Sequence, residues 1–244
     1  MGTPALELAA DTNPNRFLNG RDWSDPRYAE VRQSIARFYR EVLDGEAHPY
    51  GSKYPETIVT HWSREWEYPW AVLNAELAPG MRVVDLGCGG SPLLPYLARE
   101  RGCIGVGIDT NFKSTTGRNN LRGFKEAPEK LFPEITWLQE SMAEISLADS
   151  SMDRAFCISV MEHVARPVVE QTLAHVHRIL RPGGLALITT DVDGEHRTLT
   201  MSYLQIIEAA EDAGLALRGE MDMTPPKDTP GTYDVVGFVL EKPA

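Results

Sequence analysis

Apolar residues near the amino end of the chain recur at the spacing of an amphipathic helix. They stand three or four residues apart at Tyr28, Val31, Ile35, Phe38, Tyr39 and Val42, and Gly45 follows as a stop signal. A second helical segment, residues 56–77, carries Trp62, Trp66 and Trp70 at intervals of four, and Pro69 is expected to break or kink it. The pattern predicts an N-terminal helical cap over residues 1–79.

Beyond Arg82 the pattern changes to short apolar runs separated by amphipathic stretches. The runs are Val83–Leu86, Ile104–Ile108, Ile135–Leu138, Ala155–Ile158 and Leu185–Ile188. Buried strands joined by helical crossovers imply a parallel sheet with helices on both faces. In the tail, residues 215–223 and 233–240 flank a Pro- and Gly-rich loop, which predicts two antiparallel strands at the sheet edge. We therefore expect a doubly wound α/β core over residues 80–244.

Composition and charge narrow the classes of partner. Among 244 residues, 35 are acidic and 24 basic, so the formal net charge is -11. Because this field repels phosphate backbones and anionic lipids, and no basic patch interrupts it, we expect no nucleic-acid or membrane partner. No apolar run approaches the roughly 20 residues of a membrane span, and the start lacks a basic, apolar leader. The sequence therefore predicts a cytoplasmic protein, of unspecified oligomeric state.

The three cysteines, Cys88, Cys103 and Cys157, lie in apolar or Gly-rich surroundings without CxxC spacing. An odd number of such residues does not form a disulfide framework or a zinc site. We expect them to be reduced thiols in the core.

The most informative segment follows the first apolar run, at Asp85-Leu86-Gly87-Cys88-Gly89-Gly90-Ser91-Pro92. A strand that ends before this loop places it at the carboxyl edge of the sheet, where open α/β folds bind ligands. Ser91 suits a helix N-cap and Pro92 the first helical position. Asp109 ends the next strand, and a carboxylate there can accept hydrogen bonds from both hydroxyls of a ribose. The loop therefore predicts a nucleoside-containing ligand.

Four motifs in this order resemble those of class I S-adenosylmethionine-dependent methyltransferases that act on small molecules. They are the loop Asp85–Gly89, the strand-ending Asp109, the run Asp153–Ile158 with Met161–Val164, and Arg178–Gly184. The resemblance covers residues 80 to about 191. It implies a Rossmann-like, seven-stranded, mostly parallel sheet with an antiparallel last strand, and S-adenosyl-L-methionine as the cofactor.

The resemblance also implies which residues contact the cofactor. Asp85 would anchor the methionine amino end, Gly87 and Gly89 would contact the cofactor through their backbone, and Asp109 would hold the ribose. Further predicted contacts are Cys88, Thr110, Asn111, Ser141, Met142, Ile158 and Ser159. Ser141 departs from the family, because many relatives have an Asp that binds the adenine amino group there.

The tryptophan-rich segment leaves two interpretations open. The three rings lie on one helical face, so they can pack the cap onto the sheet. Alternatively the segment forms a lid, in which Arg64 binds the cofactor carboxylate while Tyr68 or Trp70 covers it and excludes water.

The catalytic candidates are His163 and Asp191. An imidazole titrates near neutral pH, so His163 suits a general base, although it can equally organise its turn. Asp191 follows the fifth apolar run, where it can face an acceptor or belong to a solvated loop. Some ubiquinone-pathway O-methyltransferases hold a metal with a Glu three residues before a Glu-His pair. Because Ser159 stands at that position, we expect no metal.

The sequence therefore predicts a methyltransferase for a small molecule such as a sugar, a natural-product intermediate or another metabolite, methylated at oxygen. Nitrogen and carbon acceptors stay open, because such catalysis depends mainly on positioning. A non-catalytic cofactor-binding or scaffold protein is one alternative. A nicotinamide-dependent oxidoreductase is a weaker one, since Pro92 stands where a dinucleotide fingerprint has its third glycine.

Overall fold

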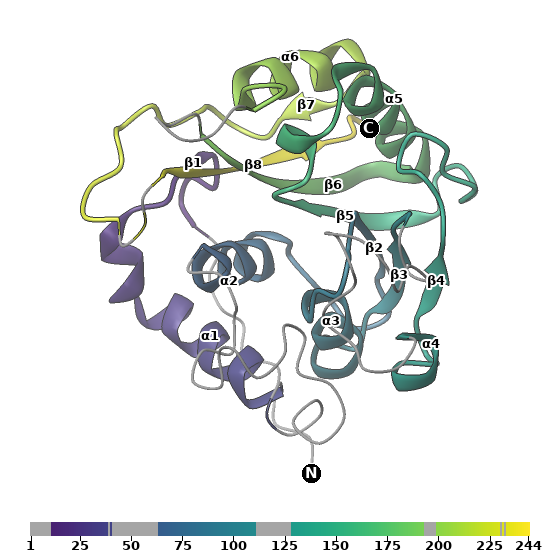
Figure 1. Ribbon diagram of the computed structural model, residues 1–244, viewed down its shortest axis with the longest axis horizontal. Helices are drawn as coiled ribbons and strands as arrows, with labels where there is room; N and C mark the ends of the chain where they lie inside the picture. Colours follow the sequence, from purple (N-terminus) through teal and green to yellow (C-terminus); the bar gives the residue numbers. More distant parts are fainter. Residues whose placement is uncertain are drawn as a thin grey trace.

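The computed structural model describes residues 11–38, 40, 63–110, 128–192, 199–229, 231 and 233–244. In this part of the chain, a mixed sheet of eight strands separates two layers of helices (Figure 1). The doubly wound α/β architecture predicted from the apolar runs is confirmed.

Five parallel strands form the centre of the sheet. They are β2 (Arg82–Leu86), β3 (Ile104–Ile108), β4 (Thr136–Leu138), β5 (Met152–Ile158) and β6 (Leu180–Asp191). Their spatial order is β4-β3-β2-β5-β6, so the chain changes direction across the sheet between β2 and β5. Ligands of open α/β sheets bind at the carboxyl ends of the strands beside such a switch point.

Three further strands extend the sheet beyond β6. Strand β8 (Val235–Glu241) is antiparallel to β6, as predicted for the last strand. The two-residue strands β7 (Ala216–Leu217) and β1 (Arg16–Phe17) both pair with β8 in the antiparallel sense. The expected strand over residues 215–223 is therefore much shorter than predicted. The two predicted tail strands do form an antiparallel extension of the sheet, and β1, which the sequence did not predict, also pairs with β8.

The helices form two layers. Helices α1 (Pro26–Phe38), α2 (Arg64–Asn74) and α3 (Leu93–Arg101) pack on one face, and α5 (Arg166–Ile179) and α6 (Tyr203–Asp212) on the other (Figure 1). Short helical turns are η1 (Gly20–Trp23), α4 (Pro128–Leu131) and η4 (Met161–His163). Helix α2 continues through Pro69 to Asn74. The division at residue 79 stays a prediction, although β1 ties part of the predicted cap into the sheet.

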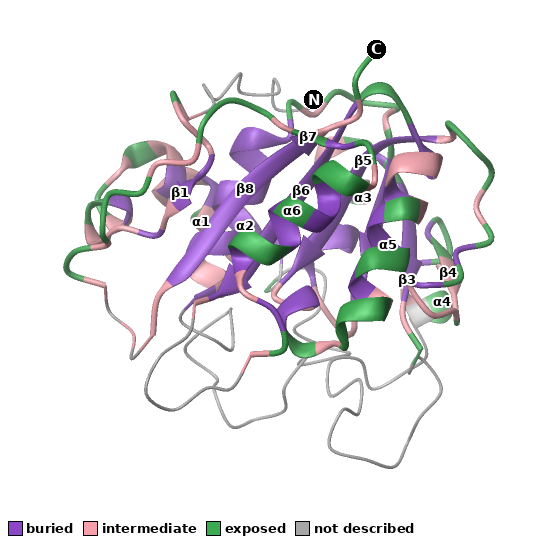
Figure 2. Cartoon of the chain, turned by 90° about the horizontal axis from the view of Figure 1, so that it is seen from above, coloured by how far each residue is buried: buried purple, intermediate pink, exposed green. Residues whose placement is uncertain are grey.

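Each face of the sheet has its own hydrophobic core. Neighbouring residues of a strand point to opposite faces, so Val83 packs with α1, α2 and α3, whereas Val84 packs with α5 and α6. Leu187 and Ile188 of β6 alternate in the same way. Figure 2 shows the result, with buried strands and exposed outer faces of α5 and α6. Burial on both faces explains why the strands read as continuous apolar runs.

Two of the three tryptophans fasten the cap helix onto the sheet. Trp66 and Trp70 are fully buried and stacked, with ring centroids 5.8 Å apart. The Trp70 ring lies so close to Gly237 of β8 that a Cβ atom there would stand 2.6 Å from Cε2. The packing interpretation is thus confirmed for these two rings, whereas Trp62 lies outside the described residues.

The three cysteines are buried and free, as predicted. Within the described ranges, no helix is long and apolar enough to cross a membrane.

Candidate active site

The loop from β2 to α3 brings backbone, instead of side chains, to the carboxyl edge of the sheet. Gly87 and Gly89 have φ angles of 68° and 48°, which L side chains rarely adopt. A Cβ atom on Gly87 would stand 2.8 Å from Cγ1 of Val160, so only glycine lets the turn after β5 approach this closely. The N-cap of α3 is Pro92, one residue later than predicted, and Ser91 Oγ accepts a hydrogen bond of 3.1 Å from the Leu93 N–H.

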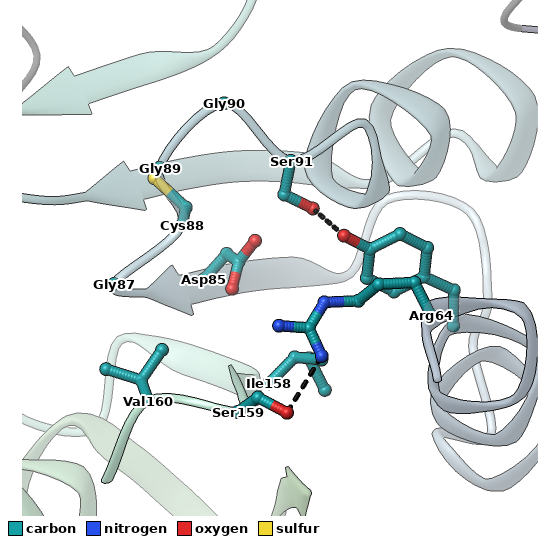
Figure 3. A pocket seen from close by; sticks show the side chains of 11 residues that line it. Arg64, Asp85, Gly87, Cys88, Gly89, Gly90, Ser91, Ile158, Ser159 and Val160 are labelled. Atoms are coloured by element: carbon teal, nitrogen blue, oxygen red, sulfur yellow. Dashed lines mark hydrogen bonds between the residues drawn. The ribbon is translucent and has the colours of Figure 1, made fainter. Parts of the chain in front are cut away.

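A cavity of about 130 Å³ opens between this loop, the start of α2 and the end of β5; we call it the first cavity (Figure 3). Its walls are Arg64, Tyr68, Asp85, Gly87, Cys88, Gly89, Gly90, Ser91, Ile158, Ser159 and Val160. Arg64 and Asp85 point into it from different elements. The cavity therefore offers one cationic and one acidic group to the same ligand.

The acidic group is unusual, because Asp85 is 3 % exposed. Burial raises the pKa of the Asp85 carboxyl to about 8; nearby Asp109 adds to the shift and Arg64 opposes it. The carboxyl is therefore poised to lose a proton when a cationic group enters the cavity.

Arg64 is held by a neighbour one helical turn away. Its Nη1 donates to the Glu67 carboxylate and, over 2.8 Å, to Oγ of Ser159. At the other wall, Ser91 Oγ donates to the Tyr68 hydroxyl over 3.1 Å (Figure 3). The N-terminal part of α2 thus forms one side of the cavity.

A second cavity of about 290 Å³ shares Gly87, Ser159 and Val160 with the first, so the two are adjacent. Its other walls are Ile108, Asp109, Thr110, Glu140, Met142, His163 and Val164. The Asp109 Oδ2 accepts a hydrogen bond of 3.0 Å from the Gly89 N–H, which ties the end of β3 to the glycine loop. Together these adjacent cavities follow a path along the carboxyl ends of β2, β3 and β5.

The far end of this path carries a group of titratable side chains, Glu162, His163 and Asp191, which we call the Glu–His–Asp cluster. His163 Nε2 lies 3.8 Å from Glu162 Oε1 and 3.8 Å from Asp191 Oδ2. Both carboxylates are buried, whereas the imidazole is about half exposed. Glu162 Oε1 also accepts a hydrogen bond from the Asp191 N–H over 2.9 Å. Each of the three side chains offers one atom that could bind a metal ion, and these three atoms lie within 4.8 Å of one another.

The fold brings most of the predicted residues to these cavities. Arg64, Asp85, Gly87, Cys88, Gly89, Ile158 and Ser159 line the first cavity, and Asp109, Thr110, Met142 and His163 line the second. Ser141 is instead a turn residue whose Oγ accepts from the Ala143 N–H over 3.2 Å, and neither set of walls includes it. Asp191 is not among the cavity walls, but its Oδ2 lies 3.8 Å from Nε2 of His163, which lines the second cavity. Asn111 lies outside the described residues. The roles of all these residues stay predictions.

Sequence reasoning missed two contributors. Glu67 reads as a solvated helix residue, yet it is fully buried. Its spacing of three from Arg64 was the available signal, because such a pair shares one helix face. Glu140 precedes the predicted adenine contacts and lines the second cavity.

Comparisons with known proteins bear on what these cavities hold. Residues 84–188, from β2 to β6, match the model of a family described as a methyltransferase domain. This segment contains the glycine loop, Asp109 and the turn after β5. Residues 84–188 therefore form a methyltransferase domain.

Two curated relatives show how far this likeness extends. A ubiquinone biosynthesis O-methyltransferase from Paracidovorax citrulli is 34% identical over 146 residues, which cover 59% of this chain and 56% of the relative. A sterol 24-C-methyltransferase from Yarrowia lipolytica is 28% identical over 112 residues, covering 45% and 27%. The chain therefore spans only part of the length of these curated relatives.

A solved structure extends the likeness of the fold to nearly the whole chain. The geranyl diphosphate C-methyltransferase of Streptomyces coelicolor A3(2), in complex with Mg²⁺, geranyl diphosphate and S-adenosyl-L-homocysteine, matches with a TM-score of 0.56. The match covers 90% of this chain and 99% of the other at 15% identity. At this identity the comparison concerns the fold.

The residues on the path fit S-adenosylmethionine, the cofactor that the resemblance of the motifs implies. An amino-acid end carries an ammonium and a carboxylate, which match the acidic Asp85 and cationic Arg64 of the first cavity. A nucleoside end carries vicinal hydroxyls, which match Asp109 in the second cavity. Gly87 and Gly89 have positive φ angles that favour glycine, so no side chain projects from these two positions into the cavities.

Proposed function

We propose that this methyltransferase domain methylates a hydroxyl oxygen of a small molecule. The observation that carries the proposal is the position of His163. Its imidazole lines the second cavity, is about half exposed, and stands between two buried carboxylates. A base in that position can take the proton of an acceptor hydroxyl as the oxygen becomes nucleophilic.

The cofactor and the protein divide the chemistry between them. When bound, S-adenosylmethionine would supply an electrophilic methyl group on its sulfonium for transfer to the acceptor oxygen, with S-adenosylhomocysteine as the leaving group. The His163 imidazole receives the hydroxyl proton. Glu162 and Asp191 stabilise the imidazolium that forms, because each places a carboxylate oxygen 3.8 Å from Nε2.

Positioning is the larger part of the proposed catalysis. Asp85 and Arg64 would fix the amino-acid end, and Asp109 the ribose. Fixing both ends aims the methyl group at the acceptor, which turns a bimolecular step into an effectively intramolecular one. Helix α2 covers the first cavity through Arg64 and Tyr68, which supports exclusion of water from the reacting atoms.

The acidic net charge supports a small acceptor over a nucleic acid, and the likeness to an O-methyltransferase supports oxygen. A carbon acceptor is a second candidate, supported by the likeness to a sterol C-methyltransferase. Both acceptors need a base: a hydroxyl loses its proton as it attacks, whereas an alkene attacks with its π electrons and the resulting carbocation then loses a proton. His163 can serve either acceptor, and the higher identity to the O-methyltransferase favours oxygen.

The test is incubation with S-adenosylmethionine carrying a ¹³C-labelled methyl group and a panel of hydroxyl, amine and alkene acceptors. Oxygen methylation predicts a labelled product whose methyl carbon has the chemical shift of a methoxy group. Replacement of His163 by Ala should slow turnover by about 10²-fold or more while S-adenosylhomocysteine still binds. A product labelled at carbon or nitrogen would overturn the oxygen assignment. Cofactor binding without S-adenosylhomocysteine formation on any acceptor would favour a non-catalytic binding protein.

A further inference from the structure

Glu67 is the most unusual polar residue of helix α2. Its side chain is 0 % exposed, in the interior between the helix and the carboxyl ends of β5 and β6. Burying an isolated carboxylate in a protein costs several kcal/mol, so it persists only where charges and hydrogen bonds compensate it. The partners of Glu67 therefore indicate what the buried charge does.

Four donors from three parts of the fold converge on this carboxylate. Oε1 accepts from Ser159 Oγ at 2.6 Å and from Thr189 Oγ1 at 2.7 Å. Oε2 accepts from Ser63 Oγ at 2.9 Å and from Arg64 Nη1. Both oxygens are thus satisfied, and one of the donors is the cation of the first cavity.

The carboxylate is charged in this setting. Burial by itself would raise the pKa of Glu67, but the charge of Arg64 and the hydrogen bonds from Ser159 and Thr189 lower it below its ordinary value. The hydroxyls of Ser159 and Thr189 hold the Glu67 carboxylate in place, and this carboxylate in turn holds the Arg64 guanidinium. Figure 3 shows that guanidinium beside Ser159 and facing Asp85 across the cavity.

We propose that Glu67 is a positioning residue that holds the Arg64 guanidinium where it binds the carboxylate of the cofactor's amino-acid end, an inference that rests on the proposed cofactor-binding roles of Arg64 and Asp85. Glu67 itself does not touch the ligand, since it is fully buried and absent from the walls of both cavities. Its role is to keep a long, flexible arginine side chain ordered before the ligand arrives, which reduces the entropy lost on binding.

A purely structural role is the competing explanation, because the same bonds fasten α2 onto β5 and β6. The two explanations predict different ligand dependence. A positioning role affects only ligands that carry the amino-acid carboxylate. A fastening role disturbs the shared walls of both cavities and weakens every adenosine-containing ligand.

The experiment compares two ligands by calorimetry. S-adenosylhomocysteine carries the amino-acid end, whereas 5′-methylthioadenosine has the same nucleoside and thioether sulfur without it. Glu67→Gln keeps the shape of the side chain and removes the charge. We expect this variant to bind S-adenosylhomocysteine about tenfold or more weakly, and 5′-methylthioadenosine within about twofold of the wild-type value. In Arg64→Ala, adding Glu67→Gln should cause little further loss, because the two residues act as a unit.

A second pair of variants covers the case in which Glu67→Gln does not fold. Thr189→Val removes one donor to Glu67, whereas Thr190→Val changes the neighbouring buried residue, whose Oγ1 has no hydrogen-bond partner among the described residues. We expect Thr189→Val alone to weaken S-adenosylhomocysteine selectively, by a few-fold.

Each outcome decides between the explanations. Equal weakening of both ligands, or no change in either, would overturn the positioning role. A wild-type protein that binds 5′-methylthioadenosine but gains nothing from the amino-acid end would contradict the proposed roles of Arg64 and Asp85 instead. The positioning role of Glu67 can therefore fail while the proposed roles of Arg64 and Asp85 hold, and those roles have their own contradicting result.

Discussion

Binding of S-adenosylhomocysteine should release a proton from Asp85. In the free protein, burial raises the pKa of this carboxyl from the ordinary value of 3.8 to about 8, against the pull of Arg64. The ammonium of the ligand's amino-acid end would bring a positive charge to the carboxyl. Because an adjacent cation favours the ionised form, the pKa should fall toward its ordinary range in the complex.

The magnitude follows from that pKa. At pH 7, a group with a pKa of about 8 is protonated in roughly nine of ten molecules, so binding should release almost one proton. Affinity should rise by up to about tenfold per pH unit between pH 6 and pH 8, and level off above that. The same shift acts on stability: with its pKa raised on folding, Asp85 lowers the stability of the free protein as pH rises from about 4 to about 8.

The assay is isothermal titration calorimetry in pairs of buffers with different ionisation enthalpies, which reports the number of protons released. Asp85→Asn is the matched control, since it keeps the size of the side chain and cannot titrate. We expect the proton release and most of the pH dependence of affinity to disappear in this variant. Equal proton release by the wild type and Asp85→Asn would refute the assignment.

Three further predictions concern the loop, the metal and the cap. Gly87→Ala should lower the free energy of unfolding by about 2–4 kcal/mol, because it combines a positive φ with a clash against Val160. The control is Gly183→Ala, which has a positive φ but open space around it and should cost about 1 kcal/mol in the same chemical denaturation experiment. Equal losses in the two variants would contradict the clash. Turnover should survive exhaustive chelation, because Ser159 cannot supply the carboxylate ligand expected at its position. Activity lost with chelator and restored by Mg²⁺ would show that the Glu–His–Asp cluster, with Asp191 in place of the missing carboxylate, holds a metal. S-adenosylhomocysteine should slow hydrogen exchange in α2, because closure of a lid orders backbone, and unchanged exchange would favour a packing role alone.

Much of the fold could be predicted from the sequence because each central strand is buried on both faces. Such strands are continuous apolar runs, and their alternation with helices defines a parallel sheet. The glycine loop could also be predicted, because Gly87 and Gly89 adopt positive φ angles at the carboxyl edge of the sheet, where the motif placed them. Asp109 was found because its position at the end of β3 is a local property.

The features that escaped prediction depend on long-range contacts. Strand β1 consists of two residues, and its pairing with β8 joins segments more than 200 positions apart. No local sequence pattern therefore predicts this pairing. Glu67 lies on a charged helix turn, and only the arrival of Ser159 and Thr189 from distant strands makes its burial possible. The approach of Asp191 to His163 likewise requires β6 to lie beside the turn after β5.

The most direct test of the account is a calorimetric titration of S-adenosylhomocysteine into the wild type, Asp109→Asn and Asp109→Ala. The central claim is that the two cavities hold this molecule, with the ribose against Asp109. We predict a single site in the wild type. Asp109→Ala should bind at least tenfold more weakly, through the loss of two charge-assisted hydrogen bonds each worth roughly 1.5–3 kcal/mol. Asp109→Asn should lie between, since it keeps an oxygen for the Gly89 N–H. Unchanged affinity in a folded Asp109→Ala protein would contradict the claim.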